Sequence, residues 1–334
     1  MLSLKSDTLV LPSVLRQMLT NAWIRQAERL SQPATCYPEP SGEKSFLQCV
    51  EQLYPHWAGE HLITNSATEA LFLTLFTLKQ RYDDELILAV RVPCFFAVLR
   101  QAELLGIKLV PFEHGAELKR KTFNAVLLTS NFTPPYGLSV PAEEREQLVE
   151  LLDARSAWLI EDNPYDALWF DTAPLALEPE RAVRIGSVSK ILTPSFRLGF
   201  LVTRSECFKQ LRSNKITLNL STASELQSIA AETLNASYLD VLRNEWHHRA
   251  KVFHAALLSE GIVAHRPEGG SFVAFEADPR FIDKAARFGV LLDTTQHYYP
   301  DHRPRDYVRC HLGALAQDGL IEAASLLGKA YRAA

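Results

Sequence analysis

Residues 187–200 read Ser-Val-Ser-Lys-Ile-Leu-Thr-Pro-Ser-Phe-Arg-Leu-Gly-Phe, and this stretch decides the fold. Lys190 lies between small hydroxyl residues, Arg197 follows on the same stretch, and an apolar run resumes after the arginine. Lysine amines form Schiff bases with aldehydes, and pyridoxal phosphate is an aldehyde cofactor whose phosphate also needs hydroxyl and guanidinium partners. We therefore predict that Lys190 is a covalent anchor for this cofactor. The alternative is a solvated lysine on a helix.

The same run resembles the S-x-S-K-x-x-x-P-x-x-R-x-G signature of fold-type I pyridoxal-phosphate enzymes, in the class I/II aminotransferase family. The resemblance implies an α/β fold, with a large domain built on a mostly parallel seven-stranded sheet and a smaller α+β C-terminal domain. It also implies that Lys190 forms the Schiff base and that Ser187 and Arg197 bind the phosphate of pyridoxal 5′-phosphate.

Size and composition are those of a two-lobed enzyme. A chain of 334 residues exceeds the usual limit for one hydrophobic core, and 47% of its residues are hydrophobic. The net charge is −4 and there is no basic block, which argues against a nucleic-acid partner. No apolar run approaches the length of a membrane span, and the N-terminus lacks the layout of a signal peptide.

Cysteine usage predicts a reducing compartment. The five cysteines are odd in number and widely spaced, and they form no C-x-x-C pair. Free thiols in the cytoplasm therefore fit better than disulfides or zinc. The histidines show no metal-ligand spacing either, so we expect no metal site.

Short apolar runs alternate with helical patterns from about residue 60 to about residue 235, which predicts a doubly wound α/β layout. The predicted strands are nearly continuous hydrophobic runs, typical of strands covered on both faces. They are Leu86–Val92, Lys108–Phe112, Ala125–Thr129, Ala157–Glu161, Val183–Gly186 and Leu198–Thr203. After residue 236 the pattern predicts helices over 238–258 and 318–331 and strands over 271–276 and 307–312. We expect an N-terminal segment (1–30), a large cofactor-binding domain (31–235) and a small C-terminal domain (236–334).

A phosphate-binding turn is predicted where residues 64–71, Thr-Asn-Ser-Ala-Thr-Glu-Ala-Leu, open an apolar helix. Ser66 and Glu69 have the spacing of a capping box, and the amides of a first helical turn attract a phosphate. The segment resembles the family's T-S-G-A-x-x-A-L loop, with Ser66 in place of the glycine. We expect Ser66, Ala67 and Thr68 to bind the phosphate; the alternative is an ordinary capped core helix.

A second motif, Glu161-Asp162-Asn163-Pro164-Tyr165, ends a predicted buried strand, where α/β sheets place their ligands. A carboxylate there can face the protonated pyridine nitrogen of the cofactor, and a tyrosine three residues on can bond its phenolic O3′. The motif resembles the E-D-x-P-Y of the aminoadipate/kynurenine-type branch. We assign these roles to Asp162 and Tyr165; the alternative is a strand-end turn capped by Asp162.

Two further resemblances concern aromatic residues. The family places an aromatic after the proline of Val92-Pro93-Cys94-Phe95-Phe96 to stack on the pyridine, and Phe95 is the matching position, with Phe96 next to it. Residues 37–42 resemble the Y-x-x-P-x-G segment whose tyrosine reaches the phosphate of the neighbouring subunit. Tyr37 and a homodimer are therefore expected. The resemblance as a whole runs from about Tyr37 to the C-terminus.

One segment departs from the family. The N-P-x-N-P-T-G loop appears here as residues 131–137, Asn-Phe-Thr-Pro-Pro-Tyr-Gly, so the asparagine that usually bonds O3′ falls on Pro134. Asn131 matches only the first asparagine of the pattern. Either Tyr165 alone bonds O3′, or the side chain of Asn131 turns toward the cofactor and bonds O3′ as well.

Arg309 is the candidate substrate ligand. It lies in the predicted strand 307–312 and matches the family's arginine for the substrate α-carboxylate, which a planar guanidinium binds through two hydrogen bonds. The alternative is a surface ion pair.

The favoured function is transfer of an amino group between an amino acid and a 2-oxo acid through a Lys190 Schiff base, with the freed amine moving the Cα proton. The Pro134 departure keeps open a second class of reaction, a pyridoxal-phosphate decarboxylase, lyase or cyclase of a specialised pathway. The third class is an effector sensor of the kind found in some transcription regulators, but no basic helix-turn-helix precedes residue 37.

Overall fold

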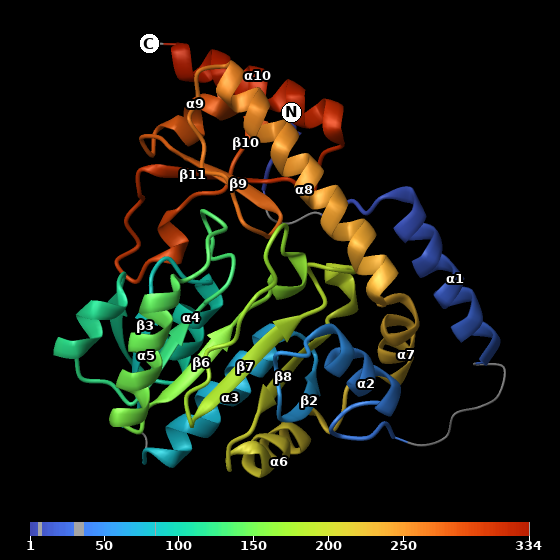
Figure 1. Cartoon of the computed structure of the whole chain (residues 1–334), viewed down its shortest axis with the longest axis vertical. Helices are drawn as coiled ribbons and strands as arrows, with labels where there is room; N and C mark the ends of the chain where they lie inside the picture. Colours follow the sequence, from blue (N-terminus) through green and yellow to red (C-terminus); the bar gives the residue numbers. More distant parts are fainter. Residues whose placement is uncertain (6–8, 30–36, 84, 334) are drawn as a thin grey trace.

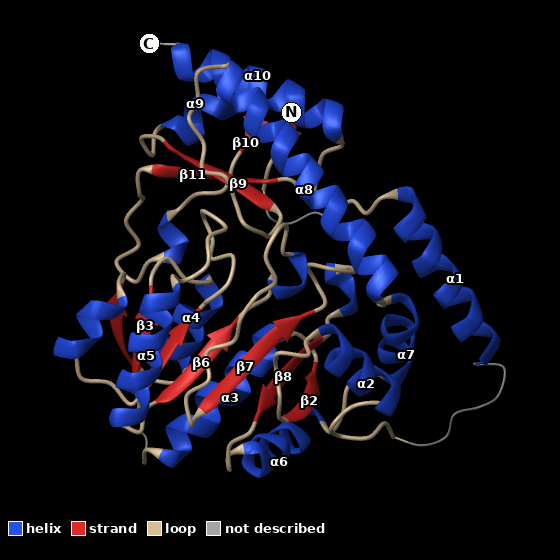
Figure 2. Cartoon of the chain, in the orientation of Figure 1, coloured by secondary structure: helices blue, strands red, loops and turns tan. Residues whose placement is uncertain are grey.

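The computed structural model describes residues 1–5, 9–29, 37–83 and 85–333 (Figure 1). Its centre is a seven-stranded sheet in the order β2-β8-β7-β6-β5-β3-β4 (Figure 2). The strands are β2 (Glu60–Thr64), β3 (Ile87–Arg91), β4 (Lys108–Phe112), β5 (Ala125–Leu128), β6 (Trp158–Asp162), β7 (Ala182–Ser187) and β8 (Gly199–Thr203). Within this sheet β8 runs against its neighbours, and the other strands share one direction.

Alternate side chains of the central strands enter different apolar layers, which explains why their sequences are hydrophobic throughout. On β3, Leu88 and Val90 belong to one buried cluster, and Ala89 belongs to another. On β6, Ile160 joins the first cluster and Leu159 the second. Both faces of the sheet are thus covered, as expected for parallel strands. The predicted strands of the large domain agree with the observed ones to within one or two residues.

Helices supply the two outer layers. One face is covered by α3 (Ala67–Arg81), α4 (Phe96–Leu104) and α6 (Phe208–Asn219), whose apolar residues share a cluster with the sheet. The opposite face is covered near β5 and β6 by α5 (Ala142–Ala154). The remaining helices here are α1 (Ser13–Arg29), α2 (Lys44–Leu53) and α7 (Ser224–Thr233), and α7 packs against both of the others.

The C-terminal region begins with the long helix α8 (Ala236–Ser259), which leads away from the large sheet (Figure 1). It continues through β9 (Phe272–Glu276), α9 (Phe281–Arg287), β10 (Val290–Leu291), β11 (Tyr307–His311) and α10 (Gln317–Arg332). Strands β9 and β11 pair antiparallel, and α10 packs on α8. Four 3-10 turns complete the described elements: η1 (Gly115–Arg120), η2 (Asp166–Leu168), η3 (Pro194–Phe196) and η4 (Gln296–Tyr298).

The N-terminus packs on the C-terminal region, a contact that the sequence did not indicate. Strand β1 (Leu2–Ser3) pairs parallel with β10, and Leu4 is fully buried. The backbone amide of His311 donates to the carbonyl of Leu4 at 2.8 Å. The division at residues 30 and 235 stays a prediction; the first residues of the chain add an edge strand to the C-terminal part.

In the part of the chain that the structure describes, no helix combines the length and apolarity needed to cross a membrane.

Backbone packs closely against backbone at Gly199, the first residue of β8. Gly199 pairs with Thr64 of β2 on one side and with Ser187 of β7 on the other. A Cβ atom at Gly199 would lie 2.2 Å from the amide nitrogen of Ala67 and 2.3 Å from the carbonyl carbon of Ser66. Since both atoms belong to backbone, neither can swing away, and only glycine fits.

Gly199→Ala is therefore expected to lower the free energy of unfolding by about 1–3 kcal/mol, the usual cost of forcing atoms into a packed site. Urea unfolding measures this. The matched control is Gly319→Ala in α10, where the nearest atom to an added Cβ is 3.4 Å away, in ordinary contact. That variant should be neutral or more stable, because alanine favours helix. A Gly199→Ala protein as stable as the wild type would contradict the packing argument.

Candidate active site

The sequence-predicted residues converge on one cavity of about 350 Å³ between the large sheet and the C-terminal region. It lies where β2, β5, β6 and β7 end and β8 begins, the edge at which α/β sheets bind ligands. Ten of the twelve predicted site residues line it: Ser66, Ala67, Thr68, Phe95, Asp162, Tyr165, Ser187, Lys190, Arg197 and Arg309. The other two, Tyr37 and Asn131, do not.

The phosphate turn begins α3 as predicted, with Ser66 as its N-cap. The hydroxyl of Ser66 accepts from the amide of Glu69 at 3.4 Å, and the Glu69 carboxylate accepts from the amide of Asn65 at 2.6 Å. Ser66 has a φ of 113°, a backbone conformation that favours glycine. This explains why glycine is usual at this position of the loop, while the hydroxyl compensates here by capping the helix.

Lys190 follows β7 and lies half-buried in the cavity wall. Its Nζ lies 5.9 Å from the ring centroid of Tyr165, within the range of a cation–π contact. The hydroxyl of Ser187, buried at the end of β7, accepts from the amide of Ser189 at 3.2 Å. Arg197 has an exposed side chain and a left-handed backbone, with φ 51°, at the turn between η3 and β8. The covalent-anchor motif thus contributes an amine, two hydroxyls and a guanidinium to one wall.

Asp162 ends β6 and is only 7% exposed. Burial raises the pKa of its carboxyl from 3.8 to about 7. A buried carboxylate needs a positive partner to remain ionised. The protonated ring nitrogen of pyridoxal phosphate is such a partner, so the electrostatics of this wall fit the cofactor.

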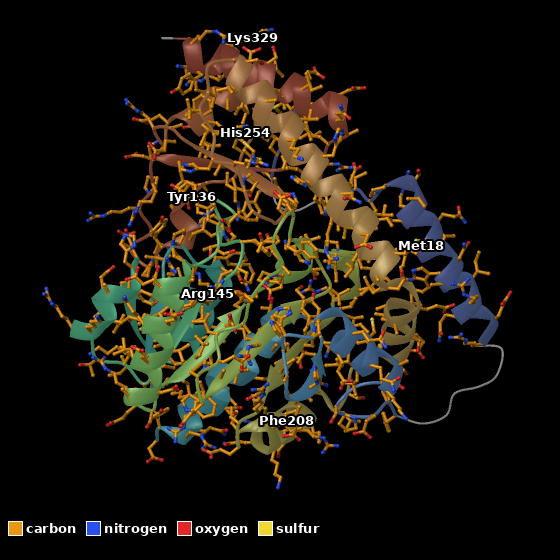
Figure 3. The ribbon with its side chains drawn as sticks, in the orientation of Figure 1. Met18, Tyr136, Arg145, Phe208, His254 and Lys329 are labelled. Carbon is orange, nitrogen blue, oxygen red and sulfur yellow. The ribbon has the colours of Figure 1, made fainter. Side chains whose placement is uncertain are left out.

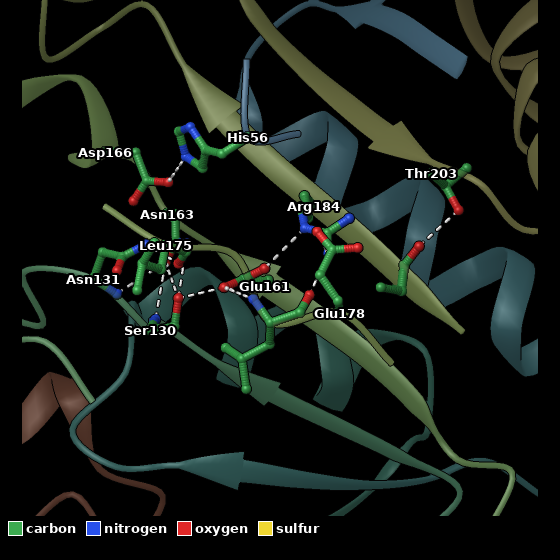
Figure 4. A network of polar contacts seen from close by, with 12 residues as sticks. His56, Ser130, Asn131, Glu161, Asn163, Asp166, Leu175, Glu178, Arg184 and Thr203 are labelled. Atoms are coloured by element: carbon green, nitrogen blue, oxygen red, sulfur yellow. Dashed lines mark hydrogen bonds and ion pairs between the residues drawn. The ribbon is translucent and has the colours of Figure 1, made fainter. Parts of the chain in front are cut away.

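A buried network holds the end of β6 in place (Figure 4). The Oδ1 atom of Asn163 accepts from the amide of Ser130 at 2.9 Å, and its Nδ2 donates to the Ser130 hydroxyl at 3.0 Å. That hydroxyl donates in turn to Glu161. Glu161 pairs with Arg184, Nε to Oε2, at 3.1 Å. Buried charges are stable only when paired in this way, and the result is a rigid support under Asp162.

Asn131 belongs to this support and not to the cavity wall. Its Oδ1 accepts from Nη2 of Arg145, a residue labelled in Figure 3, at 2.6 Å. Its Nδ2 donates to the carbonyl of Leu175 at 3.0 Å (Figure 4). Both polar ends are therefore engaged. Pro134 and Pro135 line the cavity instead, without a side-chain donor. This geometry favours the alternative in which Tyr165 bonds O3′ without help from Asn131.

Phe95 lines the cavity at the start of α4, and Phe96 does so next to it. The two rings meet edge to face, with centroids 4.7 Å apart. Because both rings line the cavity, their positions do not show which one stacks on the cofactor. The prediction that Phe95 is the stacking ring rests on the sequence motif. Tyr37 lies outside the cavity with 83% of its surface exposed.

The structure adds wall residues that sequence reasoning missed. Ser189 stands inside the lysine motif and could have been found there. Tyr298 and Tyr307 come from the C-terminal region and flank Arg309. Tyr307 lies on the same strand as Arg309, so the sequence could have indicated that it lies near the site. Tyr298 lies in a polar loop, where no sequence pattern indicates a site residue.

Comparisons with known proteins agree with this geometry. Residues 6–304 match the family described as aminotransferase class I and II. The chain belongs to this family. It is a pyridoxal-phosphate-dependent aminotransferase of the class I/II type, and the fold and cofactor inferred from the lysine motif are confirmed.

Three similar proteins illustrate the range of this aminotransferase fold. The 2-aminoadipate transaminase of Thermus thermophilus is 24% identical over 310 residues, 83% of this chain and 77% of that protein. A solved structure from the same organism is that of LysN, an α-aminoadipate aminotransferase complexed with N-(5′-phosphopyridoxyl)-L-leucine. It superposes on this chain with a TM-score of 0.84 at 22% sequence identity, and the superposition covers 98% of this chain and 91% of LysN. The transcriptional regulator PdxR of Corynebacterium glutamicum is 28% identical over 255 residues, 71% of this chain and 55% of the regulator.

In the described residues of the aminotransferase, no group of three or more His, Cys, Asp or Glu side chains could hold a metal ion.

The raised pKa of Asp162 gives a pH-dependent prediction for the cofactor-free protein. Between about pH 4 and 7 the folded protein keeps a proton on Asp162 that the unfolded chain has released. The free energy of unfolding should therefore fall as pH rises through this window, by up to about 4 kcal/mol from this group. Urea unfolding at pH 5 and pH 8, compared with Asp162→Asn, isolates the effect. If the two proteins lose equal stability, Asp162 is not desolvated.

Proposed function

We propose that this aminotransferase moves the amino group between an α-amino acid and a 2-oxo acid, with Lys190 as both cofactor anchor and proton carrier. The observation that carries the proposal is the shared cavity of one amine, Lys190, one buried carboxylate, Asp162, and two guanidiniums, Arg197 and Arg309, on separate elements. These charges complement a phosphate, a ring cation and a substrate carboxylate.

Each side chain then has one role. The amides of the α3 first turn, the Ser187 hydroxyl and Arg197 would hold the phosphate, because free amides and guanidiniums bind such anions. Asp162 would face the ring nitrogen, Tyr165 would donate to O3′, and Phe95 would stack on the ring. Bound pyridoxal phosphate supplies the electron-withdrawing ring that makes the substrate Cα proton removable. Nζ of Lys190 would accept that proton, as a general base requires.

Arg309 is proposed to bind the substrate α-carboxylate. It lies on β11 with 10% of its side chain exposed, and it is paired with Asp293 at 3.3 Å. Within the described part of the chain, its buried Nε has no hydrogen-bond partner. An unpaired buried donor is costly, so an incoming carboxylate oxygen would gain a strong, charge-assisted bond there.

A second reaction class stays open at the O3′ end of the cavity. Pro134 stands where the family motif has an asparagine donor, and the side chain of Asn131 is bonded outside the cavity. A cofactor with fewer donors at O3′ is the feature that favours a decarboxylase, lyase or cyclase. Transamination differs from these reactions in leaving the amino group on the cofactor.

The prediction for this function concerns Lys190. Wild-type holoenzyme mixed with a panel of amino acids should lose the absorbance of the lysine-bound cofactor and yield the aminated cofactor with a 2-oxo acid. Lys190→Ala should abolish turnover, because both the anchor and the base are removed, while the fold is retained. Borohydride reduction followed by peptide mapping should label Lys190. A label on another lysine would refute the anchor, and product without aminated cofactor would favour the second class.

We further propose that the working enzyme is a cytoplasmic homodimer in which Tyr37 completes the phosphate site of the partner. The exposure of Tyr37 outside its own cavity supports a role at a second chain. Its free cysteines among the described residues, Cys49, Cys94, Cys207 and Cys310, suit a reducing compartment.

Sedimentation equilibrium is expected to give a dimer. Tyr37→Phe should weaken cofactor binding without changing the dimer, because it removes one hydroxyl from the phosphate site. A fully active monomer would rule out the shared site.

A further inference from the structure

Tyr298 contacts Arg309 directly in the cavity wall. Nη2 of Arg309 donates to the Tyr298 hydroxyl at 2.6 Å, and the guanidinium lies 4.8 Å from the centroid of the Tyr298 ring. Both side chains line the cavity. A phenol that accepts from arginine still has its own proton to donate. The hydroxyl can therefore serve a third group in the same cavity.

The backbone of Tyr298 is bonded both within its own turn and to the large-sheet side of the cavity. Its carbonyl accepts from the amide of Cys94 at 3.1 Å, and its amide donates to the carbonyl of Thr295 at 3.1 Å. Cys94 precedes Phe95 and belongs to the large-sheet side, whereas Tyr298 belongs to the C-terminal region. The hydroxyl is thus held in place before any ligand arrives, which lowers the ordering cost of binding.

Two prolines of the cavity wall and one histidine of β11 offer no free donor for that position. Pro134 and Pro135 line the cavity without an N–H of any kind. His311, two residues after Arg309, has both ring nitrogens engaged. Its Nε2 lies 2.9 Å from the Ser271 hydroxyl, and its Nδ1 accepts from the Gly313 amide at 3.1 Å. A carboxylate on Arg309 has two oxygens to satisfy, and the Tyr298 hydroxyl is adjacent to the guanidinium.

We propose that Tyr298 is a substrate-binding residue whose hydroxyl donates a hydrogen bond to the α-carboxylate held by Arg309. Two side chains then bind the carboxylate: the charged guanidinium of Arg309 and the neutral phenol of Tyr298. This inference rests on the proposed role of Arg309 and names a further specificity residue for the same reaction. The pair selects substrates that carry a carboxylate over plain amines.

The test uses holoenzyme and two ligands: an amino acid that the wild type converts, and the amine that lacks only its carboxylate. Absorbance of the bound cofactor gives both dissociation constants. Tyr298→Phe should weaken binding of the amino acid by about ten-fold or more, the loss of one hydrogen bond to a charged group. Binding of the amine should stay unchanged, and KM should rise while kcat at saturation changes little.

Tyr299→Phe is the matched control, because Tyr299 is the next residue of the same loop and its side chain does not line the cavity. It should change neither constant. Tyr298→Gln keeps a donor and should recover part of the loss. In an Arg309→Ala background, Tyr298→Phe should have a smaller effect, because the carboxylate is no longer placed beside the hydroxyl.

Three results would overturn the proposal: equal weakening of amino-acid and amine binding, no weakening of either, or the same loss in Tyr299→Phe. Each would mean that the Tyr298 hydroxyl does not contact the carboxylate. A wild type that gives no aminated cofactor would instead contradict the proposed function, so the two failures are distinguishable.

Discussion

The site depends on one row of backbone pairing across three strands. Thr64, Gly199 and Ser187 stand side by side on β2, β8 and β7. Because β8 runs against its neighbours, it begins at the edge where they end. The phosphate turn after β2, the lysine after β7 and the arginine before β8 are therefore brought to one place. The absence of a side chain at Gly199 lets the Ser66–Ala67 turn lie directly against this row.

Charge balance is the second constraint on the cavity. Three cationic side chains and one carboxylate line its wall: Lys190, Arg197, Arg309 and Asp162. The carboxylate has a raised pKa because burial removes it from water. A ligand with two anionic groups and one ring cation complements these four side chains. Pyridoxal phosphate carrying an amino acid has this distribution, so the electrostatics and the family agree.

The relatives show how far this arrangement is shared. A transaminase and a transcription regulator both align with the chain at under 30% identity. The departures from the family's motifs lie in the cavity wall itself. Ser66 caps α3 at a φ that favours glycine, and Pro134 stands at the motif position of an asparagine.

Sequence alone predicted the elements, the fold class and the cofactor. Continuous apolar runs predicted β3 to β8, because strands covered on both faces need apolar side chains on both. Short motifs predicted that Lys190, Asp162, Tyr165 and the phosphate turn belong to one site, because each motif consists of residues that are close in the chain. Ten of twelve predicted site residues consequently line one cavity.

Tertiary structure decided what depends on contacts between distant residues. Asn131 matched a motif, yet Arg145 and the Leu175 carbonyl hold its side chain outside the cavity. Tyr298 carried no motif, and only the fold of the 292–306 loop brings its hydroxyl to Arg309. The N-terminal strand β1 is two residues long, too short for any pattern, and it exists because β10 offers it a partner. Local patterns report local conformation, whereas the partners of a side chain are set by packing between segments far apart in the chain.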